Sequence, residues 1–302
     1  MNSGWPGGYL ISDYNNSTLE NKKKKIVKRR ERVAAYLFFI SAAVSVLAVL
    51  LICAFLFASG APVFGKIGIF NFLFGKEWSP VDSPASFGIL PMIAGSLYVT
   101  SVALAAGLPV GILTAIFLAF CCPQKIYKIL KPAVDLLAGI PSVVYGFFGM
   151  MAIVPLTGNS IFSAGILLGI MILPVVAGIS ESALRAVPRE YYEGALALGA
   201  GHYRSIFYVL LPAAKSGVLA AAVLGLGRAV GETMAVIMVA GNQARLPVSL
   251  FKGARTLTSN IVLEMGYAAG LHREALIGTG VVLFVFVLIV NISFSVIKRK
   301  RL

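Results

Sequence analysis

Long apolar runs, separated by short polar segments, are the dominant pattern along this chain. A helix that crosses a bilayer needs about 20 predominantly apolar residues, and six runs of the sequence qualify. These runs are Val33–Ser59, Ile89–Phe120, Pro132–Leu156, Ile161–Ser180, Gly217–Ala240 and Ala275–Ile297. The pattern therefore predicts an all-α membrane protein with six transmembrane helices.

Composition supports this prediction, and the charge distribution adds an orientation. Of the 302 residues, 58% are hydrophobic and 13% are charged, whereas soluble domains carry about 25% charged residues. The net charge is +14, and eight Lys and Arg residues lie between Lys22 and Arg32, directly before the first run. With six spans, 19 of the 26 basic residues fall on that side and six on the other. The positive-inside rule then places both termini in the cytoplasm, and the charge needs no nucleic-acid partner.

One polar segment, Glu181–Lys215, interrupts the apolar pattern between the fourth and fifth runs. Pro188 suits the start of a helix, and Gly199 suits its end. The segment predicts a short helix over Pro188–Leu198, with Tyr191, Ala195 and Leu198 at the spacing of a contact face. An amphipathic helix on the membrane surface is the alternative.

Two opposite charges lie within the fifth run. Arg228 and Glu232 are four residues apart, which places them on one face of a continuous helix. A charge at the bilayer centre costs about 2.5–3.5 kcal/mol on insertion scales, so such residues face a protein interior or an aqueous path. The pair either fixes helix packing as a salt bridge or lines a path for an anion, because a guanidinium matches phosphate oxygens bidentately.

The polar segment also carries a spaced motif. Glu193-Gly194-Ala195 is followed by three residues, Gly199, nine residues, and then Val209-x-Leu211-Pro212. This resembles the EAA loop of ABC-importer permeases, with Gly194 in place of Ala and Val209 in place of Ile. The resemblance implies a type I, MetI-like importer permease fold, in which the loop is a cytoplasmic helix that docks into a separate ATPase subunit.

Two further segments resemble one subgroup, the phosphate-importer permeases of the PstC type. Pro141–Gly146 reads PSVVYG, and Gly227–Val236 reads GRAVGETMAV, followed by Gly241-Asn242. The resemblance covers about residues 87–291. It implies an integral membrane subunit that imports inorganic phosphate and that lies in the plasma membrane of a prokaryote.

The resemblance also implies roles for individual residues and partners. Arg228 and Glu232 would lie on the translocation path, with Thr233 beside them and with Pro141 and Ser142 shaping the third span. For Pro141, a simple proline kink is the alternative. Glu193, Gly194, Ala195 and Gly199 would couple to the ATPase. The implied partners are a second permease (PstA-like), P-loop ATPase subunits (PstB-like) that bind ATP-Mg, an extracytoplasmic phosphate-binding protein (PstS-like) and membrane lipid.

These features divide the chain into five parts. They are a basic cytoplasmic tail expected to be disordered (1–32), the first transmembrane helix (33–59), an irregular extracytoplasmic loop (60–88), a permease core with the coupling loop 181–215 (89–297), and a basic cytoplasmic tail (298–302).

Absent motifs restrict the mechanism. The sequence contains no G-x-x-x-x-G-K-[ST] and no H-E-x-x-H or G-x-S-x-G, so we expect no catalytic residue, metal site or cofactor in this chain. Two alternatives stay open: a permease of the same fold for another oxyanion or an organophosphate, and an ion-coupled secondary transporter. A signalling role has no separate mark in the sequence.

Overall fold

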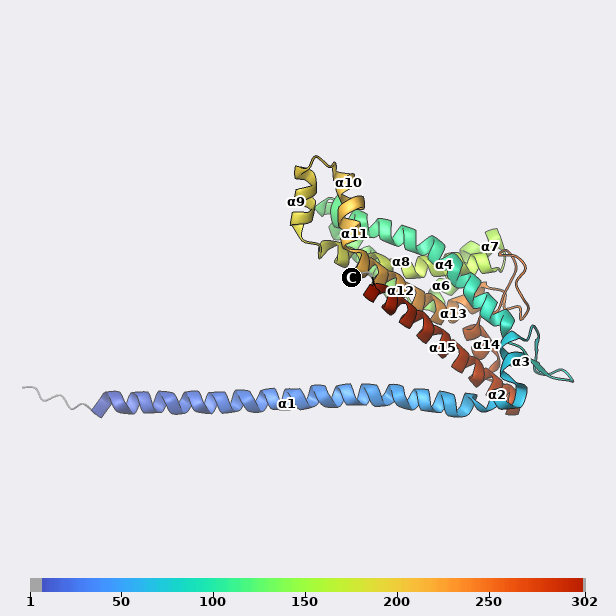
Figure 1. The fold of residues 1–302 in the computed structure, drawn as a ribbon, viewed down its shortest axis with the longest axis horizontal. Helices are drawn as coiled ribbons and strands as arrows, with labels where there is room; N and C mark the ends of the chain where they lie inside the picture. Colours follow the sequence, from blue (N-terminus) through green and yellow to red (C-terminus); the bar gives the residue numbers. More distant parts are fainter. Residues whose placement is uncertain (1–6, 301–302) are drawn as a thin grey trace, which may run out of the picture. The chain divides into compact units, whose positions relative to one another are not determined.

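The computed structural model describes the backbone of residues 7–300 and the side chains of residues 30–293 and 296. The chain divides into two units, residues 1–55 and residues 56–302. The described part of the first unit, residues 7–55, belongs to one long helix, α1 (Gly7–Gly60), shown in Figure 1. Its backbone is helical from Gly7, where the charge pattern predicts a disordered tail. Lys, Arg and Glu are good helix formers, so they extend the helix of the apolar run that follows.

The second unit consists of helices with one small sheet. Its elements before the coupling loop are α2 (Pro62–Ile67), α3 (Ile69–Phe74), β1 (Trp78–Ser79), β2 (Ser86–Phe87), α4 (Leu90–Ile116), η1 (Phe117–Cys121), α5 (Gln124–Gly139), α6 (Ser142–Phe148), η2 (Gly149–Ile153), α7 (Val154–Thr157) and α8 (Ile161–Arg185). Those that follow are α9 (Arg189–Ala197), α10 (His202–Ser205), η3 (Ile206–Leu210), α11 (Leu211–Ala213), α12 (Lys215–Gly231), α13 (Met234–Val239), α14 (Leu257–Glu264) and α15 (Gly270–Lys300). The η segments are π-helical.

Four helices of the described chain are long and apolar enough to cross a membrane: Arg30–Ile67, Leu90–Cys121, Ile161–Arg185 and Gly270–Ser293. Two further spans arise if bent helix pairs are each counted as one. The first pair, Gln124–Gly139 with Ser142–Thr157, bends by 99°, and the second, His202–Ala213 with Lys215–Gly231, bends by 72°. The predicted six spans are therefore reached only through two broken helices.

Both breaks differ from the continuous runs that hydrophobicity predicts. Pro132–Leu156 is interrupted at Ile140, whose backbone is extended (ψ 128°) because it precedes Pro141. Gly217–Ala240 is interrupted at Glu232, which is also extended (ψ 133°). Apolar length alone does not detect these breaks, since the interrupting residues leave the average hydrophobicity high.

The loop of residues 60–88 is more ordered than its Gly and Pro content predicts. It forms α2, α3 and the antiparallel pair β1–β2, in which Trp78 faces Phe87. Phe72 and Trp78 are buried in a cluster with Ile89 and Leu276. Apolar side chains of the loop therefore pack in one small core with residues of α4, α14 and α15.

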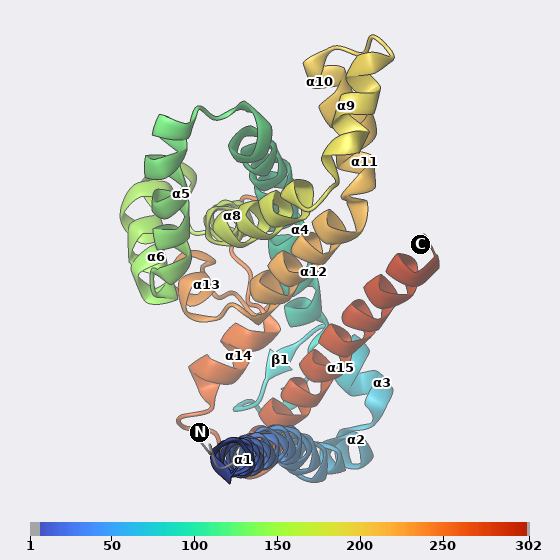
Figure 2. The same cartoon turned by 90° about the vertical axis from the view of Figure 1, so that its left-hand side faces the viewer.

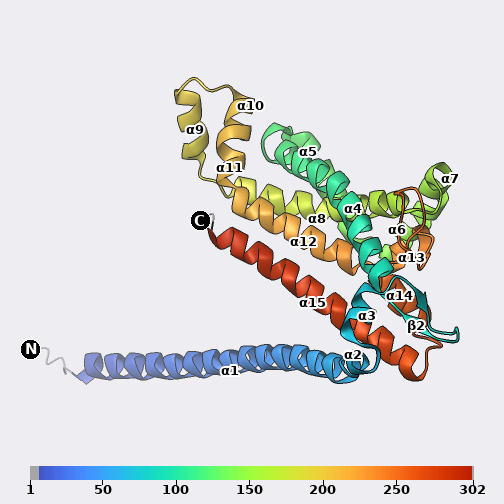
Figure 3. The same ribbon diagram turned by 45° about the vertical axis from the view of Figure 1, so that its right-hand side comes forward.

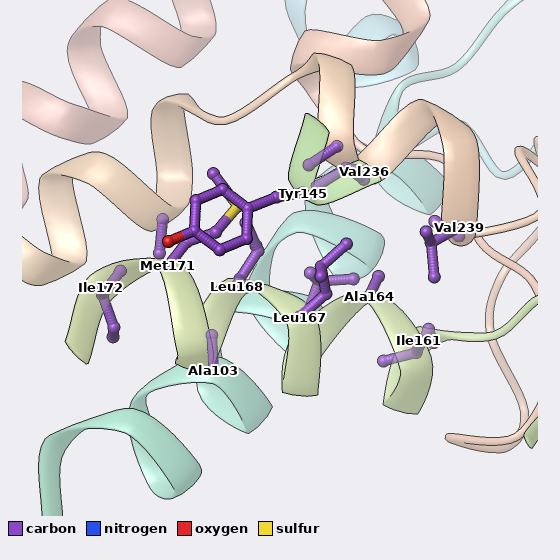
Figure 4. Close-up of a cluster of buried hydrophobic side chains, with 14 of the residues drawn as sticks. Ala103, Tyr145, Ile161, Ala164, Leu167, Leu168, Met171, Ile172, Val236 and Val239 are labelled. Carbon is purple, nitrogen blue, oxygen red and sulfur yellow. The ribbon is translucent and has the colours of Figure 1, made fainter. Parts of the chain in front are cut away.

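Close glycine contacts join α4 to α8, the two central helices. A Cβ on Gly107 would lie 2.7 Å from the carbonyl oxygen of Gly169, and one on Gly165 would lie 2.4 Å from Val102 Cγ1. Small residues at such positions let two helix backbones approach closely. Beside this contact, α8 contributes Leu168 and Met171 to the main apolar core, which Figure 4 shows around Tyr145.

The polar segments lie at the two ends of the second unit. Helices α9 and α10 project beyond one end of α8 and α12 (Figures 1 and 3), and α15 ends toward the same side. Helix α14 and the sheet lie at the other end (Figure 2). The coupling loop and the C-terminal end of α15 thus share one side of the unit, as the charge pattern requires. Which side faces the cytoplasm stays a prediction.

Replacing Gly107 with Ala is expected to destabilise the protein by about 1–3 kcal/mol, because the added methyl group overpacks the α4–α8 contact. Thermal unfolding of the detergent-solubilised chain measures the effect. Gly139→Ala is the matched control, since a Cβ at Gly139 meets nothing within 4 Å. Equal unfolding temperatures for the two variants would show that the glycine contact does not hold the helices together.

Candidate coupling surface and translocation site

The coupling loop contains the short helix that the sequence predicts. Helix α9 covers Arg189–Ala197, directly after Pro188, and Gly199 follows with a positive φ of 83°. This conformation is strained for residues with a side chain, so glycine suits the end of the helix. The predicted start and stop signals are thereby confirmed.

The faces of α9 differ in part from the predicted contact face. Tyr191 and Leu198 are exposed, and Leu198 keeps 91% of its surface accessible, whereas Ala195 is buried against the rest of the chain. Glu193 and Gly194 are also exposed, and a Cβ on Gly194 would meet nothing within 4 Å. Of the predicted coupling residues, Ala195 therefore anchors α9 and the other three, including Gly199, face outward.

Apolar packing holds the loop to the core. Ile206 and Leu210 of η3 are buried with Leu184 of α8 and with Ala115 and Ile116 of α4. A cavity of about 410 Å³ lies between α9 and this base, with Phe120, Arg185 and Glu193 among its lining residues. The loop is thus a projecting, firmly based surface with accessible side chains at its tip.

The first broken span turns at the predicted Pro141 and Ser142. Pro141 is exposed and precedes α6, which begins at the half-buried Ser142. The hydroxyl of Tyr145 donates to the carbonyl oxygen of Leu137 across the bend, at 2.8 Å. Pro141 therefore does more than kink a helix, because it separates two helices whose junction a side chain then bridges.

The second broken span changes the prediction for Arg228 and Glu232. Because α12 ends at Gly231, the two residues do not share a helical face. Glu232 Oε1 instead accepts backbone N–H groups of Thr233 at 3.1 Å and Ala235 at 3.3 Å, at the start of α13. The carbonyl oxygen of Glu232 accepts from Thr258 Oγ1 at 3.1 Å. The alternative of a salt bridge between Arg228 and Glu232 within one helix is therefore wrong. The Glu232 side chain instead caps the start of α13.

Arg228 lacks a protein partner within the described part of the chain. Its side chain is half-buried in the last turn of α12, and it makes no hydrogen bond or ion pair with the described side chains. Thr233, the remaining predicted residue, donates its hydroxyl to the carbonyl oxygen of Gly231 at 3.3 Å.

The two broken spans meet side by side. Helix α13 packs against α6 (Figure 2), where a Cβ on Gly146 would lie 2.6 Å from Met238 Sδ and 3.0 Å from Ala235 Cα. The segments Pro141–Gly146 and Gly227–Val236, which resemble one family separately, are thus one structural unit. Within the described residues, no group of His, Cys, Asp and Glu is arranged to hold a metal ion.

Sequence reasoning gave no role to three side chains at these sites. Tyr145 is part of the Pro141–Gly146 motif, but the motif does not predict its contact with Leu137. Thr258 is 26 residues from its acceptor Glu232, so their contact could not be predicted from spacing. Glu181 lies at the start of the polar segment and is almost completely buried. Only the fold shows what these residues contact.

Replacing Glu232 with Ala removes the acceptor at the start of α13 and is expected to cost about 1 kcal/mol of stability, the typical value for a lost helix cap. Glu232→Gln keeps an oxygen at this position and should cost less. Thermal unfolding and hydrogen exchange at the Thr233 and Ala235 amides measure the difference. Equal exchange rates in both variants would contradict the capping role.

Known proteins resemble this chain over most of its length. Residues 107–301 match the family described as "Binding-protein-dependent transport system inner membrane component". The chain is 38% identical over 305 residues to the probable ABC transporter permease protein YqgH of Bacillus subtilis (strain 168), covering 96% of each. It is 34% identical over 258 residues to the phosphate transport system permease protein PstC of Pasteurella multocida (strain Pm70), covering 76% of this chain and 80% of the relative.

The fold has a solved counterpart as well. A structure of the MetNI methionine ABC transporter in an inward-facing conformation aligns with a TM-score of 0.56 and 23% identity, over 70% of this chain and 94% of that one. At this identity the likeness shows the fold alone, and it confirms the MetI-like architecture. The chain therefore belongs to the family of binding-protein-dependent transport system inner membrane components.

Proposed function

We propose that this chain is a transmembrane subunit of an ATP-driven importer of inorganic phosphate, located in a prokaryotic cell membrane. Relatives named as phosphate transport system permeases, at 31–34% identity over most of the chain, support this substrate. The observation that carries the proposal is the guanidinium of Arg228, which has no partner among the described residues and lies in the last turn before the second break. A second, related permease would complete the pathway.

The chemistry of the broken spans suits a path for an anion. Non-helical backbone at membrane depth is tolerated where it is covered by protein or lines a water-filled cavity, and transporters place substrate sites at such breaks. Arg228 would offer its donors to phosphate oxygens, with Ser142 and Thr233 as neutral neighbours. The Glu232 carboxylate accepts hydrogen bonds from backbone N–H groups at the start of α13, so it does not pair with Arg228.

The features of the coupling loop favour a separate ATPase as the source of energy. The sequence holds no P-loop, and the exposed apolar side chains of Tyr191, Leu198 and Tyr203 at the tip of the loop offer a surface for another protein. ATPase subunits that bind ATP-Mg would dock there, and a binding protein would deliver phosphate on the opposite side. Hydrolysis would take place entirely in the ATPase subunits.

Another oxyanion or an organophosphate is the second candidate substrate, because Arg228 would attract any of these anions. The named relatives favour phosphate. Membership of a binding-protein-dependent family disfavours the gradient-driven transporter.

Arg228→Ala is expected to lower uptake of radiolabelled phosphate at least about 10-fold. A hydrogen bond to a charged group contributes about 1.5–3 kcal/mol, and each 1.4 kcal/mol is a factor of ten. The measurement uses vesicles containing the assembled importer and its binding protein. Arg32→Ala, which alters an exposed arginine of α1, should leave uptake unchanged. Wild-type uptake by the Arg228 variant would overturn the proposed pathway, and competition by sulfate or glycerol phosphate would reveal the alternative substrates.

Leu198→Glu is expected to reduce the amount of ATPase subunit that copurifies with this chain at least about 10-fold, because burying a leucine contributes about 1.5–3 kcal/mol. Val248→Glu is the matched control, since Val248 is 81% exposed and lies outside the coupling loop. If both variants retain the same amount of ATPase, the tip of the coupling loop is not the docking surface.

A further inference from the structure

Glu181 is a buried charge that neither the coupling motif nor the translocation site includes. It lies one turn before the C-terminal end of α8, and its side chain is only 3% exposed. Removing a carboxylate from water costs several kcal/mol unless the group is paired and hydrogen-bonded. A charge in this position therefore depends on its partners, which here come from α5 and from α8 itself.

Two helices meet at this carboxylate, and Arg185 extends the contact to a third element. Its Oε1 atom accepts from the hydroxyl of Tyr127 in α5 at 2.8 Å and from Nε of Arg185 in α8 at 2.8 Å. Its Oε2 atom lies 3.4 Å from Nζ of Lys131 in α5. Arg185 also donates to the carbonyl oxygen of Leu118 at the end of the second span, at 2.7 Å, and its guanidinium lies 4.9 Å from the centre of the Tyr127 ring.

The position of α5 depends on the contacts to Glu181, whereas the position of the coupling loop depends on apolar packing. Apolar packing holds the loop to α4 and α8, whereas α5 has no fully buried residue. The helix packs on α8, and its described hydrogen bonds and ion pairs to α8 all end on Glu181. The polar attachment of α5 to α8 within the described residues therefore rests on Glu181, beside the half-buried apolar side chains of Val134 and Leu137.

The two ends of this connection lead to the two functional sites. Only Ala186, Val187 and Pro188 separate Arg185 from α9. At its far end, α5 reaches the bend at Pro141, where the hydroxyl of Tyr145 donates to the carbonyl oxygen of Leu137. A displacement of α9 that moves the end of α8 thus reaches the broken span through Glu181.

We propose that Glu181 is the joint that makes α5 follow the coupling loop, so that ATPase movements reach the bend at Pro141. This inference rests on the proposed function. Glu181 acts as a positioning residue, since it contacts neither the substrate path nor the docking surface. Its negative charge holds Tyr127, Lys131 and Arg185 together. Neutralising it leaves Arg185 without a carboxylate partner among the described residues and leaves Lys131 with only the exposed Asp135.

The first test compares transport with ATP hydrolysis in the assembled importer, reconstituted with its binding protein. Glu181→Gln is expected to lower the phosphate transported per ATP hydrolysed at least 10-fold while hydrolysis continues. Tyr127→Phe removes one hydrogen bond but no charge, so it should give a smaller loss in the same direction. The control is Asp135→Asn, which removes the other carboxylate that pairs with Lys131. Asp135 Oδ1 lies 2.9 Å from Lys131 Nζ, and the Asp135 side chain is 56% exposed. A proportional loss of both activities in Glu181→Gln, or a ratio equal to that of the control, would overturn the proposal.

The second test measures the joint directly and does not depend on transport. Spin labels on cysteines at Ala133 in α5 and Ala186 after α8, both exposed positions, report one distance in a background with Cys53, Cys121 and Cys122 replaced by Ser. The wild-type distance should stay narrow and unchanged between the nucleotide-free and ATP-bound complexes, whereas Glu181→Gln should broaden it. An unchanged distribution in the variant would refute the joint. An importer without phosphate uptake but with the expected distances would instead refute the proposed function alone.

Discussion

Backbone N–H and C=O groups inside an apolar layer have to find partners within the protein, and this constraint decides how the two broken spans are built. A continuous helix meets it without help, but a break releases several groups at once. At the first break the released carbonyl of Leu137 is taken by Tyr145, and at the second the carboxylate of Glu232 takes two N–H groups. Thr258 accounts for the remaining carbonyl of Glu232. Each break is thus a stable, fixed feature.

With these groups satisfied locally, Arg228 remains as a charge without a protein partner in the described structure. The break that separates Arg228 from Glu232 therefore also leaves the guanidinium donors of Arg228 free to bind a ligand. A paired arginine would present a neutral surface to a passing anion, whereas an unpaired one retains its donors. The packing of α13 on α6 brings the two signature segments together, because Gly146 lies against Ala235 and Met238.

The second unit combines two kinds of contact. Glycines fit α4 and α8 together so closely that a single methyl group would disturb them, and apolar side chains seat the coupling loop on their ends. Helix α5 is different, because polar contacts to Glu181 connect it to α8. Close apolar packing resists deformation, and a buried carboxylate loses stability when its partners move away, so the contacts to Glu181 keep α5 with the end of α8. This contrast fits a core that stays rigid and a helix that moves with a buried charge.

Local signals in the sequence determined the number of apolar runs, the helix of the coupling loop and the absence of an ATP-binding loop. Pro188 and Gly199 act on their own neighbours, so their effect can be read without a fold. The pairing of Arg228 with Glu232 could not be read in this way, since it assumed an unbroken helix. Only tertiary structure decided that break, because the partners of Glu232 and Leu137 become available only when α6, α13 and α14 are in place. For the same reason the burial of Glu181 could not be predicted from the sequence, because it depends on a helix that begins more than 50 residues earlier.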